Sequence, residues 1–143
     1  MAERLLFITL GFLLTEFFSY AAHRWLFHGI LWKIHSTHHK PRKGILEMND
    51  IFSLAFALIS ILLMFASNSL LSSIGLGIAI YGLVYFIVHD AFTHRRFFPF
   101  RSKNKILLTI RAAHQRHHQS VEKKGLEPFG LLIFNYKKFA RKN

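Results

Sequence analysis

Apolar residues dominate two long stretches of the chain. Residues Ile51–Val88 contain no Lys, Arg, Asp or Glu, and a stretch of that length can cross the roughly 30 Å hydrocarbon layer twice, at about 20 residues per crossing. Residues Leu5–Ala22 form another apolar stretch, interrupted only by Glu16. The pattern predicts membrane-crossing helices at about Arg4–His28, Ile51–Ala66 and Leu70–His89.

Polar segments separate and follow these spans. Trp32–His39 is expected to be helical and to end at Lys40-Pro41, because the residue before a proline disfavours α geometry. A further helix is expected over about Lys103–Gln119. The tail Pro128–Phe139 is apolar with a basic end, which favours an interfacial helix or hairpin over a fourth crossing. We therefore predict one domain, residues 1–143, with an all-α integral membrane fold of about three to four transmembrane helices.

Two features of the spans have a second interpretation. Ser19-Tyr20-Ala21 loosely resembles a signal-peptide cleavage site, but cleavage there would separate the first histidines from their helix, so we expect an uncleaved span. The third span carries small residues that suit close helix contact or reflect ordinary glycine usage in membrane helices. These small residues are Gly75, Gly77, Ala79 and Gly82.

Positive charge is distributed unevenly along the chain. Of its 19 Lys and Arg residues, only Arg4 precedes the first span, and the others lie in Arg24–Lys43 or after Asp90. By the positive-inside bias, the basic segments are expected to be cytoplasmic, with the uncharged turn at Ser67–Ser69 on the opposite side. The excess charge suits anionic lipid headgroups; nucleic-acid binding is not expected, because no recognition motif is present.

All ten histidines fall in four short clusters, with the spacing HxxxxH, HxxHH, HxxxxH and HxxHH. The clusters are His23/His28, His35/His38/His39, His89/His94 and His114/His117/His118. Neutral imidazole is the commonest protein ligand for transition metals. The chain has no cysteine, which excludes thiolate zinc sites and cysteine-ligated iron–sulfur clusters within it. A single histidine is often an ordinary surface or core residue, but this repeated pattern predicts a metal site.

The spacings indicate how the rings can be arranged. Residues at i, i+3 and i+4 share one helix face, so each HxxHH cluster can converge on a point beside its helix. Residues at i and i+5 are about 140° apart on an α-helix; each HxxxxH pair therefore reaches different metals, or shares one if the helix distorts. Ten nitrogens are too many for one ion. We expect two adjacent metals with four or five imidazoles each, and nitrogen ligation suits Fe, Zn, Cu or Ni equally.

At these residues the chain resembles the bacterial β-carotene 3-hydroxylases of the fatty acid hydroxylase and sterol desaturase superfamily. The similarity runs from about Glu16 to Gly130. Its motifs are His23-Arg24-Trp25-Leu26-Phe27-His28-Gly29, His35-Ser36-Thr37-His38-His39, Asn49-Asp50, Tyr85-Phe86-Ile87-Val88-His89-Asp90-Ala91-Phe92-Thr93-His94, Ala113-His114-Gln115-Arg116-His117-His118 and Pro128-Phe129-Gly130.

The resemblance implies a membrane di-iron monooxygenase that uses O2 and takes electrons from reduced ferredoxin. Such an enzyme places hydroxyls at carbon 3 of β-ionone rings, turning β-carotene into β-cryptoxanthin and zeaxanthin, and the ten histidines would be its metal ligands. The basic surface would then also dock an acidic ferredoxin. Phe52, Phe56 and Tyr85 are candidates to line a carotenoid channel.

The chain departs from the family pattern in ways that leave the substrate open. The stretch His94–Phe100 is one residue longer than usual, Phe27 stands where methionine is common, and no proline follows Pro128-Phe129-Gly130. A sterol or fatty acyl hydroxylase or desaturase, or a carotenoid ketolase, is the alternative within the same chemistry. A histidine-lined zinc or copper transporter is a remote alternative, since Ile51–Val88 offers only scattered polar residues.

Glu16 and Asp90 are the candidate catalytic carboxylates. Glu16 lies inside a span, where an ionisable residue is a functional candidate, and it lies two helical turns before His23; we expect it to hydrogen-bond a ligand histidine or an iron-bound water. The alternative is a protonated carboxyl satisfied by a neighbouring helix. Asp90 is expected to orient a ligand imidazole, or else to form an ion pair with Arg95 or Arg96. Asn49 and Asp50 are expected to cap a helix rather than to serve the metals.

Overall fold

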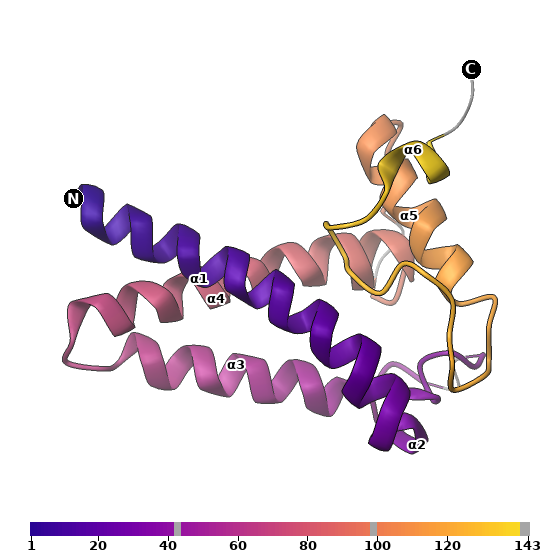
Figure 1. Cartoon of the computed structure of the whole chain (residues 1–143), viewed down its shortest axis with the longest axis horizontal. Coiled ribbons are helices and arrows are strands. Elements are labelled where there is room, and N and C mark those ends of the chain that lie inside the picture. The colour runs from indigo at the N-terminus through magenta and orange to yellow at the C-terminus, as the bar shows by residue number, and fades with distance from the viewer. Residues whose placement is uncertain (42–43, 98–99, 141–143) are drawn as a thin grey trace.

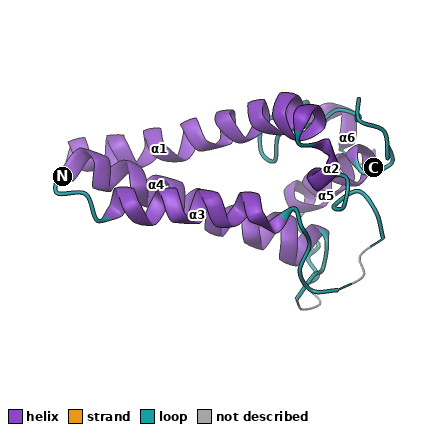
Figure 2. Cartoon of the chain, turned by 90° about the horizontal axis from the view of Figure 1, so that it is seen from below, coloured by secondary structure: helices purple, strands orange, loops and turns teal. Residues whose placement is uncertain are grey.

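The computed structural model describes residues 1–41, 44–97 and 100–140, and these residues form helices and loops without strands. Three long helices run side by side, and the remaining elements gather at one end of them (Figure 1). The N-terminus and the α3–α4 turn lie at the other end (Figure 2). In chain order the elements are α1 (Ala2–Ala21), the π-helix η1 (Ala22–Ile30), α2 (Trp32–His35), α3 (Asp50–Met64), α4 (Ser69–Tyr85), the π-helix η2 (Phe86–Thr93), α5 (Lys105–His117) and α6 (Tyr136–Phe139).

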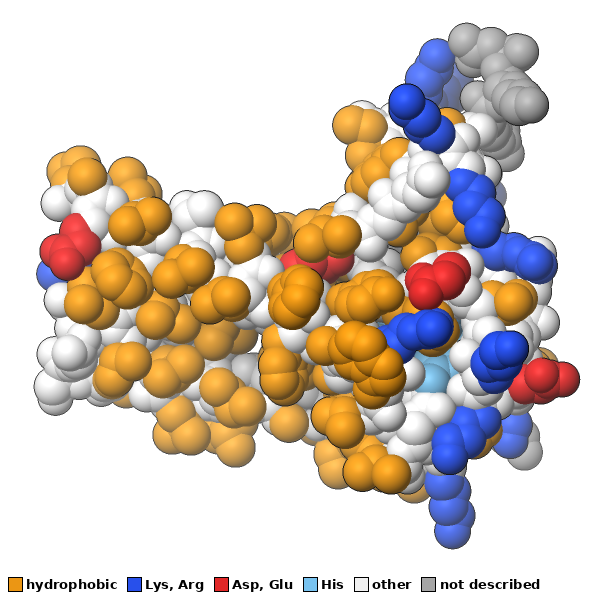
Figure 3. Space-filling model, in the orientation of Figure 1, with side chains coloured by type: hydrophobic (Ala, Val, Ile, Leu, Met, Phe, Trp, Pro, Cys, Tyr) orange, Lys and Arg blue, Asp and Glu red, His pale blue; other side chains and the backbone are white. Residues whose placement is uncertain are grey.

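Two helices are long and apolar enough to cross a membrane: α1 with η1, over Ala2–Ile30, which has a kink at Gly29, and α4 with η2, over Ser69–Thr93. The apolar helix α3 has 15 residues and measures about 22 Å at 1.5 Å per residue, less than the hydrocarbon thickness. Large apolar side chains point outward from all three, for example Leu13, Phe17, Leu54, Leu58 and Leu83. Hydrophobic side chains cover this part of the surface, while Lys and Arg gather at the end that holds the histidines (Figure 3). These features are those of a membrane protein.

The central helix α4 packs against both α1 and α3, and two glycines allow the backbones to approach. A Cβ on Gly77 would collide with the Ile8 carbonyl of α1, and a Cβ on Gly75 would collide with Met64 of α3. Nothing lies within 4 Å of the Cβ position of Gly82. The interpretation of the small residues as helix-contact positions is thus right for Gly75 and Gly77 and wrong for Gly82.

Two predicted elements differ from the structure. The helix expected over Trp32–His39 ends at His35, because the next amides form tighter i→i+3 turns: Thr37 N–H donates to Ile34 O and His38 N–H to His35 O. The tail expected to form an interfacial helix or hairpin over Pro128–Phe139 is mostly irregular and has only the short helix α6. It folds inward instead, since Phe129 and Leu131 are buried.

Candidate metal centre

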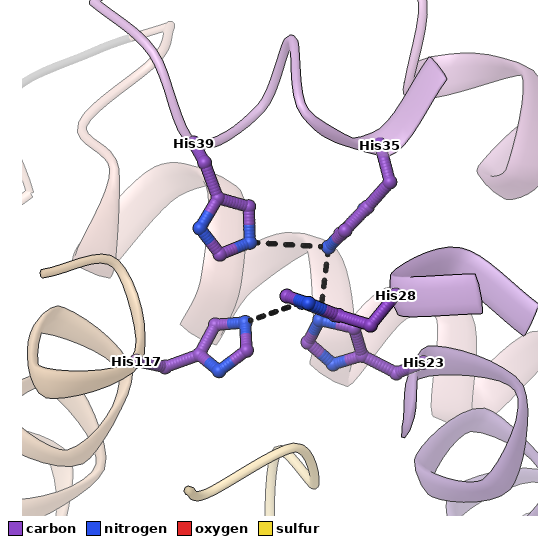
Figure 4. A group of neighbouring side chains, drawn as sticks. All are labelled: His23, His28, His35, His39 and His117. Carbon is purple, nitrogen blue, oxygen red and sulfur yellow. Dashed lines mark hydrogen bonds between the residues drawn. The ribbon is translucent and has the colours of Figure 1, made fainter. Parts of the chain in front are cut away.

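The structure brings all four histidine clusters together at one end of the helices. The ligand nitrogens of five histidines lie within 4.8 Å of one another, and their rings point toward a common centre (Figure 4). This first group consists of His23, His28, His35, His39 and His117. A second group with the same closeness consists of His38, His94, His114 and His118. The Nε2 atom of His89 lies 3.2 Å from that of His38, so the tenth histidine adjoins the second group.

Local π-helix explains how histidines five residues apart reach the same group. A π-helix joins the amide of residue i+5 to the carbonyl of residue i, so residues five apart lie one above the other. The His94 amide donates to the His89 carbonyl at 2.9 Å, and in η1 the Leu31 amide donates to Leu26 in the same way. The helix distortion that was one of two options from the sequence is therefore present in both HxxxxH segments.

Each HxxHH cluster, by contrast, is divided between the two groups. His35 and His39 belong to the first group and His38 to the second, while His117 belongs to the first and His114 with His118 to the second. The expectation that all three histidines of a cluster converge on one point is wrong. Residues at i and i+4 stay together, and the histidine between them points to the neighbouring group.

The second ring nitrogen of four first-group histidines is hydrogen-bonded to the backbone of one loop. The Nδ1 atoms of His39, His28, His117 and His23 lie 2.9, 2.9, 2.6 and 2.7 Å from the carbonyl oxygens of Ser120, Lys123, Leu126 and Phe129. These carbonyls belong to every third residue of the segment 120–129, which we call the carbonyl strap. A carbonyl only accepts hydrogen bonds, so each Nδ1 carries the proton and each Nε2 has a free lone pair.

Side chains perform the same task for His35 and His38, and for His89 through Asp90. His35 Nδ1 donates to Asn49 Oδ1 at 2.6 Å, and His38 Nδ1 donates to Glu47 Oε2 at 2.9 Å. Asn49 occupies the N-cap position of α3 but its side chain makes no capping hydrogen bond, so the capping interpretation is wrong for its side chain. Glu47 had no signal in the sequence, because only the fold brings it to His38.

The arrangement fits bound cations. His23 and His35 both hold their protons on Nδ1, yet their Nε2 atoms lie only 3.0 Å apart, so two lone pairs face each other. Burial lowers the pKa of His39 to about 4 and those of His35 and His117 to about 3, so protonation does not relieve this repulsion near neutral pH. A metal ion between the nitrogens does. Imidazole is a normal ligand for such an ion.

In the second group the observation that favours a cation is His118, whose buried Nε2 has no hydrogen-bond partner among the described residues. The Nε2 atoms of His94 and His114 lie 2.9 Å apart beside it. Burial, followed by the nearby ring of His94, lowers the pKa of His118 far below its ordinary value. A buried nitrogen without a partner is costly, and metal coordination would satisfy it.

Glu16 does not contact a histidine, which was one of the two partners expected from the sequence. It is 1% exposed. Its Oε1 accepts hydrogen bonds from the amides of Leu132 and Ile133 at 2.8 and 2.9 Å, and its Oε2 accepts one from the Tyr81 hydroxyl at 2.7 Å. The inward fold of the C-terminal tail supplies two of the three donors, and a sequence pattern does not show that long-range contact.

Asp90 has both partners that the sequence suggested. Its Oδ1 lies 2.9 Å from His89 Nδ1 and 3.3 Å from Arg96 Nη1. The Arg96 guanidinium also forms a two-pronged ion pair with Asp50, at 2.7 Å on each oxygen, and donates to the Ile45 carbonyl at 2.7 Å. Hydrogen bonding to Asp50 raises the pKa of Arg96, so this buried cation links the start of α3 to the end of η2.

An elongated cavity of about 370 Å³ leads from the apolar helices to the histidines. It is lined by residues of α1, η1, α3, α4 and η2, including Phe52, Phe56, Tyr85 and the stacked partner of Phe52, Phe27, and histidines of both groups form part of its wall. The three aromatic residues named from the sequence are thus all in its wall. Its lining is mainly apolar, which suits a lipophilic molecule.

Known proteins show what the chain is similar to. It is 40% identical to a β-carotene hydroxylase of Pantoea ananas over 82% of this chain and 69% of that protein. It is 35% identical to one of Pseudescherichia vulneris over 89% and 74%. It is also 40% identical to the chloroplastic β-carotene 3-hydroxylase 2 of Arabidopsis thaliana, over 82% of this chain and 41% of that protein. No solved structure matches. A sequence model described as fatty acid hydroxylase matches residues 8–139, and the chain therefore belongs to the fatty acid hydroxylase family.

Proposed function

We propose that this chain is an O2-dependent di-iron monooxygenase that hydroxylates carbon 3 of the β-ionone rings of carotenoids, converting β-carotene to β-cryptoxanthin and zeaxanthin. The main observation is that an apolar cavity between the helices ends at two adjacent groups of imidazole nitrogens whose lone pairs converge. The bacterial and plant relatives are β-carotene hydroxylases by name. Together these features support a lipophilic substrate, a path by which this substrate reaches the histidines, and a redox centre at the histidines.

The ten histidines are the proposed ligands, divided as the two groups are, with His89 joining the second. Hydroxylation of an unactivated C–H bond needs an oxidant that side chains do not supply, and a bound iron pair would activate O2 for it. The reaction consumes one O2, two electrons and two protons for each hydroxyl formed and releases one water. The chain itself fixes the imidazoles, excludes bulk water around them and aims one ring of the substrate at them.

The electrons must come from outside, since the chain has no cysteine to ligate an iron–sulfur cluster. We propose a reduced ferredoxin, docked on the basic end that carries the histidines, where charge complementarity would speed association. This end would face the cytoplasm of a bacterial cell by the positive-inside bias. Anionic lipid headgroups would contact the same basic residues at the membrane edge.

Product analysis tests the proposal directly. Cells that make β-carotene should accumulate β-cryptoxanthin and zeaxanthin when they express this chain, and the purified protein should hold two irons. Replacing one histidine of each group, His117→Ala or His38→Ala, should abolish both products, whereas Thr9→Ala, on an exposed part of α1, should not. Ketones or hydroxylated acyl chains or sterols in place of these products would assign another substrate or reaction of the family.

The orientation in the membrane has its own test. Since the natural chain lacks cysteine, Ser67→Cys and Lys124→Cys each introduce a unique thiol, in the α3–α4 turn and beside the histidines. A membrane-impermeant maleimide should label intact spheroplasts of the first variant and only lysed spheroplasts of the second. The reverse pattern would place the histidines outside the cytoplasm.

A further inference from the structure

The carbonyl strap orients four histidine rings through its backbone carbonyls. The position of the strap therefore determines the orientation of these rings. The strap consists of turns and irregular backbone, and several of its residues, such as Lys123 and Lys124, are exposed. At Gly125, where φ is 63°, the backbone lies so close to the His28 ring that an added Cβ would be 2.7 Å from it. The second group differs, because carboxylates close to helix ends, Glu47 and Asp90, accept its hydrogen bonds.

An exposed irregular segment needs an anchor if it is to hold four rings in register. The strap ends at Phe129, whose carbonyl accepts from His23 and whose ring packs 5.1 Å from both His28 and His117. Three and four residues later, the amides of Leu132 and Ile133 donate to Glu16. Gly130, which follows Phe129, is close to the same carboxylate: an added Cβ would be 2.7 Å from the Ile133 carbonyl oxygen and 3.1 Å from Glu16 Oε1.

We propose that Glu16 is a positioning residue that anchors the carbonyl strap and thereby holds the first-group imidazoles ready for their metal. Its carboxylate joins the tail to Tyr81 of α4, so the anchor is fixed to the central helix. Glu16 itself is not among the described residues that line the cavity, whereas its partner Tyr81 is. The inference rests on the proposed two-metal site. It adds that the retention of the first group's metal depends on Glu16, a buried carboxylate that contacts no metal ligand.

Metal retention is the decisive measurement. Protein purified in detergent and loaded with two equivalents of iron is challenged with a chelator. Glu16→Leu, which removes all three acceptor contacts, should release one equivalent about 10-fold or more faster than the wild type, because loss of groups that orient ligands typically weakens metal binding 10–100-fold; the second equivalent should be retained as in the wild type. Glu16→Gln keeps an amide oxygen for the Leu132 and Ile133 amides and should behave like the wild type.

Hydrogen exchange provides an independent readout that does not need the metal. In Glu16→Leu the amides of residues 120–133 should exchange faster, while those of α5 should not. If Glu16→Leu does not fold, Tyr81→Phe, which removes only the hydroxyl that joins the carboxylate to α4, should give the same two results to a smaller extent. Equally accelerated release of both metal equivalents, or unchanged amide hydrogen exchange over residues 120–133, would contradict the role of Glu16 as an anchor.

Two further outcomes separate this inference from its alternatives. A Glu16→Gln protein that keeps both irons and a protected strap but loses turnover would identify Glu16 as a catalytic group and overturn a purely positioning role. A wild-type protein that binds no iron would contradict the proposed function instead. The exchange of residues 120–133 in Glu16→Leu would then still decide whether Glu16 anchors the strap.

Discussion

A histidine ligand is defined by two nitrogens, and only one of them faces the metal. In the first group the acceptor opposite the other nitrogen is a strap carbonyl for four rings and Asn49 for His35. These acceptors place the proton on Nδ1 and leave Nε2 free, which is the state that binds metal. Each acceptor is therefore as much a part of the centre as the ring that it orients.

Asn49 offers a sharp test of this point, because two other asparagines of the chain are true helix caps. Asn49→Ala removes the acceptor of His35 and should weaken metal retention about 10–100-fold with little loss of helix stability. Asn104→Ala, the matched control, removes capping bonds to Ile106 and Leu107 and should cost about 1 kcal/mol of stability without affecting the metals. Chelator challenge and thermal unfolding measure the two effects.

The opposite result would restore the capping interpretation of Asn49. If Asn49→Ala lowers the unfolding temperature as Asn104→Ala does and leaves metal retention unchanged, the hydrogen bond to His35 has no role in the centre. Asn49→Asp, which keeps an oxygen at the same position, should retain the metals if the acceptor is what matters.

Sequence reasoning identified the histidines but not most of the residues that orient them. The ten rings were predictable because their number, spacing and repetition are visible in the chain itself. Glu47, the strap carbonyls and the true partners of Glu16 were not, since each contact joins segments that only the fold brings together. Backbone acceptors leave no trace in a sequence, because every residue has a carbonyl.

At the scale of the elements, the division of each HxxHH cluster between the two histidine groups follows from helix geometry and packing. The two π-helices add a residue to a turn and so rotate the histidines five apart onto one side. The apolar pattern predicted the three long helices well, because lipid-facing surface imposes it along the whole length of a helix, although α3 is shorter than a full crossing. The short α2 and the irregular tail were not predicted, as tertiary contacts rather than local preferences decide them.

Close packing of α4 against its neighbours depends on specific glycines. Gly77→Ala should destabilise the protein by about 1–3 kcal/mol, the usual cost of overpacking, because the new methyl meets the α1 backbone at Ile8. Gly82→Ala, on the same helix, meets nothing within 4 Å and should be neutral or slightly stabilising. Thermal unfolding in detergent distinguishes them, and equal stability of the two variants would contradict the close α1–α4 contact.

At the scale of the whole molecule, the three helices and the histidine-bearing end perform separate tasks. The helices line a mainly apolar cavity whose wall also includes histidines of both groups. These histidines belong to the end of the molecule where the shorter elements gather (Figure 1). The basic surface surrounds the same end (Figure 3). A lipophilic substrate and a soluble electron donor would thus approach the centre from different directions. A substitution can therefore impair substrate access without impairing docking of the electron donor, and the reverse.

This separation can be tested by narrowing the cavity far from the metals. Ala57 on α3 lines the cavity, and Ala57→Phe should lower the yield of hydroxylated carotenoid about 10-fold or more, because a rigid ring of the substrate does not pass a filled channel. Both irons should stay bound, since no ligand or orienting group is touched. Ala55→Phe, on the same helix but not in the cavity wall, is the matched control and should leave product and iron unchanged. Equal product from both variants would show that the substrate reaches the histidines by another path.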